Sequence, residues 1–115
     1  PWEDEHRVNS KESKKIYENT QKQRAMERSI RKTKRRLIEK QQILSSDNIP
    51  DEDKKRIQSE YDRLAYRLTE QNGAYNSFCR DNNLTAQYDR NKVADFGYKQ
   101  QSKATAGAKR YMKGH

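Results

Sequence analysis

The chain has 115 residues, of which 30% are hydrophobic and 37% are charged, and its formal net charge is +9. So few apolar side chains exclude a large globular core and favour an extended helical molecule. The positive charge favours anionic partners, and its excess lies in two places, the stretch 22–40 and the end of the chain after Asp95.

Several classes of protein are disfavoured by what the sequence contains. Cys79 is the only cysteine, and His6 and His115 are the only histidines, so an internal disulfide is excluded and a four-ligand zinc site lacks its ligands. No apolar run approaches the roughly 20 residues of a membrane-spanning helix, and we expect no membrane span. We also expect no cofactor. Because the chain begins with Pro1 rather than Met, we expect it to be a piece of a longer protein.

The first part of the chain predicts one long helix, preceded by a short extension at residues 1–8. Asn9 and Glu12 have the spacing of a capping box, which predicts a helix start near residue 9. No Gly or Pro follows until Pro50, and apolar residues fall on a seven-residue frame. We therefore expect a helix at about 9–45. Its predicted inward residues are Ile16, Met26, Ile30, Leu37 and Leu44, with Gln23 and Thr33 as polar members.

A turn at residues 46–49 and a second helix at about 50–80 follow. Pro50 suits a first helical position, and the acidic residues that come directly after it favour the positive end of the helix dipole. The inward positions alternate in steps of four and three, which is the spacing of a coiled-coil seam. These positions are Ile57, Tyr61, Leu64, Leu68, Gln71, Tyr75 and Phe78. The short turn predicts antiparallel neighbours, and a kink at Gly73 stays open.

The remainder, residues 81–115, predicts a short helical segment and a basic tail. Residues 84–97 favour a short helix or two turns against the hairpin, and the tail is either a marginal helix at about 102–112 or a segment that orders on a partner. The predicted fold is therefore all-α, a long antiparallel, coiled-coil-like hairpin over residues 9–80 with these additions. Its helix-packing seam comprises Met26, Ile30, Leu37, Leu44, Ile57, Tyr61, Leu64, Leu68, Tyr75 and Phe78.

Two interpretations of the basic residues stay open. Lysine and arginine side chains that neutralise phosphates release counterions, which favours contact with a polyanion. The same pattern is typical of the outward face of a helix, where acids of the second helix such as Glu60 or Asp62 neutralise some of the charge. The candidate polyanion-binding residues are Arg24, Arg28, Arg31, Lys32, Lys34, Arg35, Arg36, Lys103, Lys109 and Arg110.

The sequence contains no pattern that organises catalysis. No nucleophile elbow, P-loop or metal motif brings its acids, hydroxyls and histidines together. Cys79 follows Phe78 and is interpreted as a residue at the edge of the core rather than a nucleophile. We therefore expect no enzymatic activity, no catalytic residues and no metal ligands.

Two segments resemble the C-terminal region of the phage minor capsid protein 2 family. They are QKQRAMERSIRKTKRR at 21–36, with a QR..ER.IR..KR run, and FCRDNNLTAQYDRNKVADFGYKQQSKATAGAKRYMK at 78–113. The second has a motif like F....L...YDR..V, which includes Tyr88, Asp89, Arg90 and Val93, and the similarity spans about residues 11–110. The resemblance implies a structural minor head protein of a tailed phage, associated with the portal vertex and with head assembly or genome delivery. It offers no catalytic residue to carry over, and the family's larger N-terminal portion lies outside this chain.

These expectations define the partners. The resemblance implies portal or capsid proteins as partners, with packaged DNA and further copies of the chain as candidates, and a location in the virion and, during assembly, in the host cytoplasm. Two alternatives stay open. One is a non-specific nucleic-acid-binding helical module that uses residues 22–40 and the tail. The other is the C-terminal effector of a toxin-like protein, which requires an active-site cluster.

Overall fold

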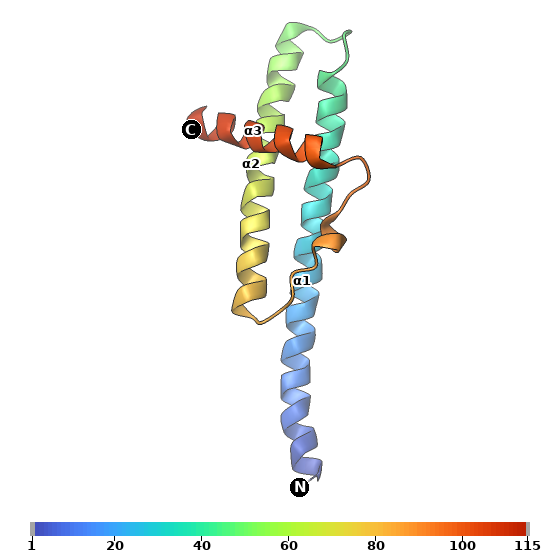
Figure 1. Ribbon diagram of the computed structural model, residues 1–115, viewed down its shortest axis with the longest axis vertical. Coiled ribbons are helices and arrows are strands. Elements are labelled where there is room, and N and C mark those ends of the chain that lie inside the picture. Colours follow the sequence, from blue (N-terminus) through green and yellow to red (C-terminus); the bar gives the residue numbers. More distant parts are fainter. Residues whose placement is uncertain (1, 115) are drawn as a thin grey trace.

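The computed structural model describes residues 2–114, with side chains from residue 11 onward. It contains the helices α1 (Trp2–Leu44), α2 (Asp51–Asp81) and α3 (Tyr98–Gly114) and a single 3-10 turn, η1 (Tyr88–Asn91). Helices α1 and α2 run antiparallel side by side, and α3 lies across α2 with its first turn near α1 (Figure 1). No strand occurs within residues 2–114, so the predicted all-α fold is confirmed.

Helix α1 is longer than predicted and extends beyond its partner. It begins at Trp2 and not near Asn9, so the predicted extension at residues 1–8 is helical from its second residue. No Gly or Pro interrupts residues 2–9, and adding a residue to an existing helix costs less than starting one. The end of α2 is level with Asn19, whose Nδ2 donates to Asn82 Oδ1 at 3.4 Å. The preceding part of α1 projects away from the hairpin, which gives the molecule a length of 72 Å against 28 and 21 Å (Figure 1).

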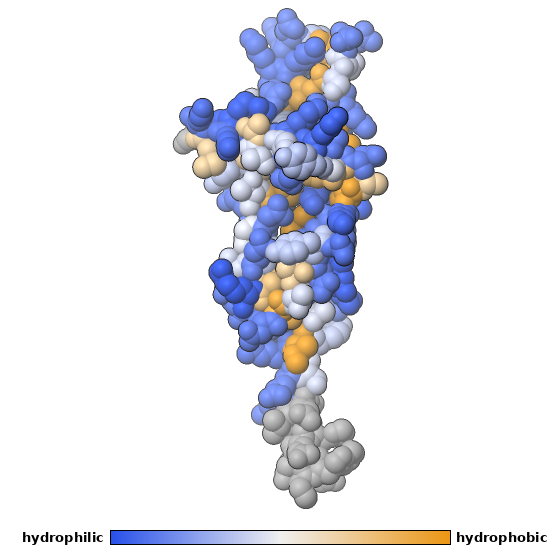
Figure 2. Space-filling model, viewed as in Figure 1, coloured by the Kyte–Doolittle hydropathy of each residue, from blue (hydrophilic) through white to orange (hydrophobic). Residues whose placement is uncertain are grey.

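The core lies along the contact between α1 and α2. The predicted seam residues Ile30, Leu37, Ile57, Tyr61, Leu68 and Tyr75 are buried, whereas Met26, Leu44, Leu64 and Phe78 are half-buried. Gln23 and Thr33 are also buried, as their inward positions predicted. Ile16 was predicted to face inward but is 61% exposed, because α2 ends before it reaches that level. Apolar surface appears as a narrow strip between the two helices (Figure 2).

The turn and the second helix lie close to their predicted bounds. Helix α2 begins at Asp51, with Pro50 as its N-cap rather than its first residue, and the Lys54 backbone N–H donates to the Pro50 carbonyl oxygen at 3.0 Å. The helix continues through Gly73, so an interruption there does not occur. Asn83 ends the hairpin with a φ of 54°, in the left-handed region that asparagine tolerates better than most residues.

The C-terminal part differs from its prediction before α3 and agrees with one alternative within it. Only Tyr88–Asn91 of the short helix or two turns expected at 84–97 forms a 3-10 turn. Of the two alternatives for the tail, the helix at about 102–112 is the one that forms, as α3. Ala104, Gly107 and Ala108 of α3 are buried against the hairpin. A Cβ atom added at Gly107 would lie 3.0 Å from Tyr61 Cε1 and 3.3 Å from Ala65 Cβ, so the absence of a side chain permits this close approach.

Candidate polyanion-binding surface

A buried polar network fixes the segment that follows α2 against α1. The hydroxyl group of Tyr75 donates to Glu27 Oε2 at 2.6 Å and accepts from the Gln87 backbone N–H at 2.8 Å. Gln23 Nε2 donates to the Thr85 carbonyl oxygen at 2.8 Å. Because the polar groups at this buried junction satisfy one another, the chain from Thr85 onward is held along α1.

The acid in this network, Glu27, is only 1% exposed. Its second oxygen, Oε1, lies 3.8 Å from Nη1 of Arg90, and this arginine provides an opposite charge at the surface end of the network. Burial and the hydrogen bond to Glu27 favour the neutral hydroxyl of Tyr75 and raise the pKa of Tyr75 to about 12. Glu27 therefore holds both the tyrosine and the arginine in place.

Two basic residues of α1 join that helix to η1. Arg31 Nη1 donates to the Arg90 carbonyl oxygen at 2.6 Å, and Lys34 Nζ donates to the Asn91 carbonyl oxygen at 2.7 Å. Lys34 Nζ also lies 5.5 Å from the centre of the Phe96 ring, and burial lowers the pKa of Lys34. Lys34 was predicted to contact a polyanion, but it is half-buried and supports the loop instead.

The outer face of α1 carries basic side chains that have no acidic partner. Within residues 11–114 no hydrogen bond or ion pair occupies the side chains of Arg24, Arg28, Lys32, Arg35 and Arg36, and all five are exposed. The two acids that were expected to neutralise part of this stretch pair with none of these five side chains. Glu60 binds Lys40 at 2.8 Å, and this contact lowers the pKa of Glu60, while Asp62 binds Arg110 at 3.0 Å. The outer face therefore keeps its positive charge.

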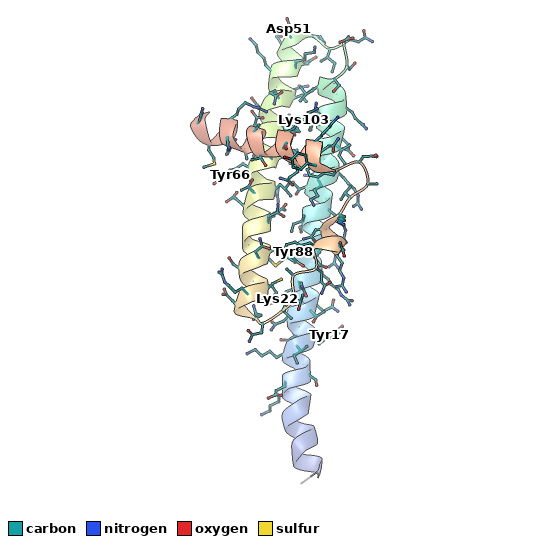
Figure 3. The ribbon with its side chains drawn as sticks, in the orientation of Figure 1. Tyr17, Lys22, Asp51, Tyr66, Tyr88 and Lys103 are labelled. Atoms are coloured by element: carbon teal, nitrogen blue, oxygen red, sulfur yellow. The ribbon has the colours of Figure 1, made fainter. Side chains whose placement is uncertain are left out.

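The basic residues of α3 form a separate group. Lys103 lies on α3, away from Tyr88 of η1 along the length of α1 (Figure 3). Lys103 and Lys109 are exposed, whereas Arg110 is committed to the ion pair with Asp62 and helps to attach α3 to α2. The ten predicted residues thus do not form one continuous site.

The structure adds Arg90 to the basic residues around α1. Together with Arg24, Arg28 and Arg31 it surrounds an open hollow of about 370 Å³ whose floor includes Glu27. Arg90 and Arg31 are 59 positions apart in the sequence, and only the path of the loop along α1 brings them together. No spacing in the sequence indicates this contact.

The described part of the chain lacks the features of other kinds of site. Among residues 11–114 no three His, Cys, Asp or Glu side chains lie together in a way that could hold a metal ion. In the same part of the chain no helix is long and apolar enough to cross a membrane. Cys79 is buried in the core next to Tyr75. The basic surface is therefore the feature that the candidate function has to explain.

This fold and this surface define the class of the protein, which is all-helical, elongated and basic. The family model described as phage minor capsid protein 2 matches residues 1–71, and the chain belongs to this family of viral structural proteins. Searches of curated proteins and of solved structures gave no match.

The family resemblance drawn from the sequence is confirmed, but its range differs. The resemblance covered about residues 11–110, whereas the match covers the N-terminal part of this chain, residues 1–71, which includes the run at 21–36. The segment with Tyr88, Asp89 and Arg90 lies outside it. This segment is the 3-10 turn η1, which contacts α1 inside the matched range through Arg31.

Proposed function

We propose that the chain is a helical component of the phage head that binds portal or capsid proteins and contacts packaged DNA in head assembly or genome delivery. Family membership supports a structural role in the virion. The observation that carries the DNA contact is the outer face of α1, where five basic side chains have no acidic partner within residues 11–114. Phosphates of a packed genome supply the opposite charge in high local concentration.

A different part of α1 supports binding to another head protein. The part that projects beyond α2 exposes Ile16 and Tyr17, which are 61% and 64% exposed. An exposed apolar residue beside an aromatic one on a helix without a partner suits a protein interface. The two contacts therefore use different portions of one helix.

A binding titration tests the contact with DNA. Fluorescence anisotropy of a labelled duplex, measured with the full chain between about 50 and 200 mM salt, should show affinity that falls steeply as salt rises, because each phosphate contact releases counterions. Failure to bind the duplex at the lowest salt contradicts the DNA contact.

The protein contact has its own test. Head proteins should be retained by the immobilised chain, and replacing Ile16 and Tyr17 by Ser should abolish retention without changing duplex binding. Retention that is unchanged in this variant contradicts the use of the projecting part of α1.

A further inference from the structure

The hollow beside η1 has the composition of an anion-binding site. Its lining carries a formal charge of +3, four arginines against one glutamate: Arg24, Arg28, Arg31, Arg90 and Glu27. Like charges gathered at one place repel, so holding them together without an anion costs free energy. The volume of about 370 Å³ and the open form admit a group that remains attached to a larger molecule.

Two of the four guanidinium groups are held by the fold. Arg31 is fixed by its bond of 2.6 Å to the Arg90 carbonyl oxygen, and the Arg90 side chain is oriented by Glu27, whose Oε1 lies 3.8 Å from Nη1. Glu27 is itself held by the Tyr75 hydroxyl at 2.6 Å. Less side-chain entropy is then lost when these two arginines bind a ligand.

The other two guanidinium groups are free to bind. Arg24 and Arg28 lie one helical turn apart on α1, are exposed, and have no partner within residues 11–114. Each guanidinium presents five N–H donors in a planar fork that matches two oxygens of an oxyanion. Fixed and free arginines thus face the same hollow.

We propose that the hollow formed by Arg24, Arg28, Arg31 and Arg90 binds a phosphate group. A tetrahedral phosphate offers oxygens in several directions, as arginines from α1 and from η1 require, whereas a carboxylate offers two oxygens in one plane. The phosphate belongs either to a nucleic-acid backbone or to a free phosphate compound. The first source rests on the proposed function, because it names the point at which α1 contacts DNA.

The test compares two pairs of arginines, one on α1 and one on α2. The Arg24→Gln/Arg28→Gln variant removes two charges at the hollow, and the Arg63→Gln/Arg67→Gln variant removes two exposed charges outside both the hollow and the basic face of α1. Within residues 11–114 no side chain of either pair makes a hydrogen bond or an ion pair, so both variants should keep the helical circular dichroism of the unchanged chain. The probes are a short DNA duplex, pyrophosphate and poly-glutamate, each titrated against the full chain.

The expected result is selective loss at the hollow. Duplex affinity should fall about tenfold or more in Arg24→Gln/Arg28→Gln, with a salt slope smaller by about two, and less than about threefold in the control pair. Loss of duplex binding alone identifies a nucleic-acid phosphate, and loss of pyrophosphate binding alone identifies a free phosphate compound.

Other results overturn the assignment. If both variants lose duplex and pyrophosphate binding equally, the phosphate site is contradicted. The proposed contact with DNA still stands in that case, provided that the unchanged chain binds the duplex. Poly-glutamate that binds as tightly as the phosphate probes, with the same dependence on Arg24 and Arg28, shows a site for acidic protein instead. If the unchanged chain binds pyrophosphate through the hollow but no duplex, the phosphate site stands and the proposed contact with DNA fails.

Discussion

Tyr75 connects three parts of the chain through one hydroxyl group. It donates to Glu27 of α1 and accepts from the backbone of Gln87, while its ring is buried in the hairpin core. A buried carboxylate is costly unless its hydrogen bonds are satisfied, so the tyrosine allows an acid to occupy the interior. The same acid orients Arg90, and the stability of the core is thereby linked to the basic hollow.

Replacing Tyr75 by Phe should reduce the free energy of unfolding by about 2–3 kcal/mol, because Glu27 loses a donor in a buried place. Chemical denaturation followed by circular dichroism measures this change. Tyr88→Phe is the control, since the Tyr88 hydroxyl bonds Asn76 at an exposed position, and it should cost less than about 0.5 kcal/mol. Equal losses in the two variants would show that the network does not stabilise the fold.

Alkaline pH should weaken the fold through the same residue. The pKa of Tyr75 in the folded chain is about 12, above the value of about 10 for an unfolded tyrosine. Its contribution is therefore complete below about pH 10 and is lost as pH rises through about 12, with a total of about 3 kcal/mol. Between pH 10 and 12, roughly, the free energy of unfolding measured by chemical denaturation should fall less steeply with pH in Tyr75→Phe than in Tyr88→Phe. Parallel curves would contradict the raised pKa.

The sequence predicted the burial of some polar residues of α1 but not of others. The inward positions of Gln23 and Thr33 followed from the seven-residue frame, and both are buried. Glu27 flanks that frame, and its burial depends on Tyr75 and on a loop whose path has no periodic pattern. The place of Arg90 in the basic site was not predictable for the same reason. Its contact with Arg31 spans 59 positions, and no local sequence pattern indicates such a contact.

At the scale of elements, the hairpin was predictable and the position of α3 was not. Large apolar residues in steps of four and three define the facing sides of α1 and α2. Helix α3 packs through Ala104, Gly107 and Ala108, which give hardly any hydrophobic signal, and it is fixed by the ion pair of Arg110 with Asp62. Small residues act here by permitting close approach, and a hydropathy pattern does not register this property.

Two glycine substitutions test this close approach with opposite expected signs. Gly107→Ala should destabilise the chain by about 1 kcal/mol or more, because the new Cβ meets Tyr61 at 3.0 Å and Asp62 at 3.1 Å. Gly73→Ala has nothing within 4 Å and should stabilise it by about 0.5–1 kcal/mol through helix propensity. Thermal denaturation of both variants provides the comparison. A stabilised Gly107→Ala variant would mean that α3 is loosely attached.

At the scale of the whole molecule, one long helix carries two surfaces of different character. Its first part projects past the end of α2 and exposes Ile16 and Tyr17, while its middle part presents arginines beside η1. Along α1, Tyr17 lies roughly 10 Å from Arg24 and roughly 28 Å from Arg36, at 1.5 Å of rise per residue. An exposed apolar end and a basic side are what the proposed contacts with a head protein and with packaged DNA require.

The central claim, that the basic side of α1 faces packaged DNA in the virion, is tested most directly by site-specific crosslinking in assembled particles. A photoreactive side chain at Lys32 lies on the basic face, and one at Glu70 of α2 serves as the control, since both positions are exposed. Irradiation of filled heads should link the chain to DNA from position 32 and not from position 70. Crosslinks from position 32 to protein alone, or equal yields of DNA crosslinks from both positions, would contradict the claim.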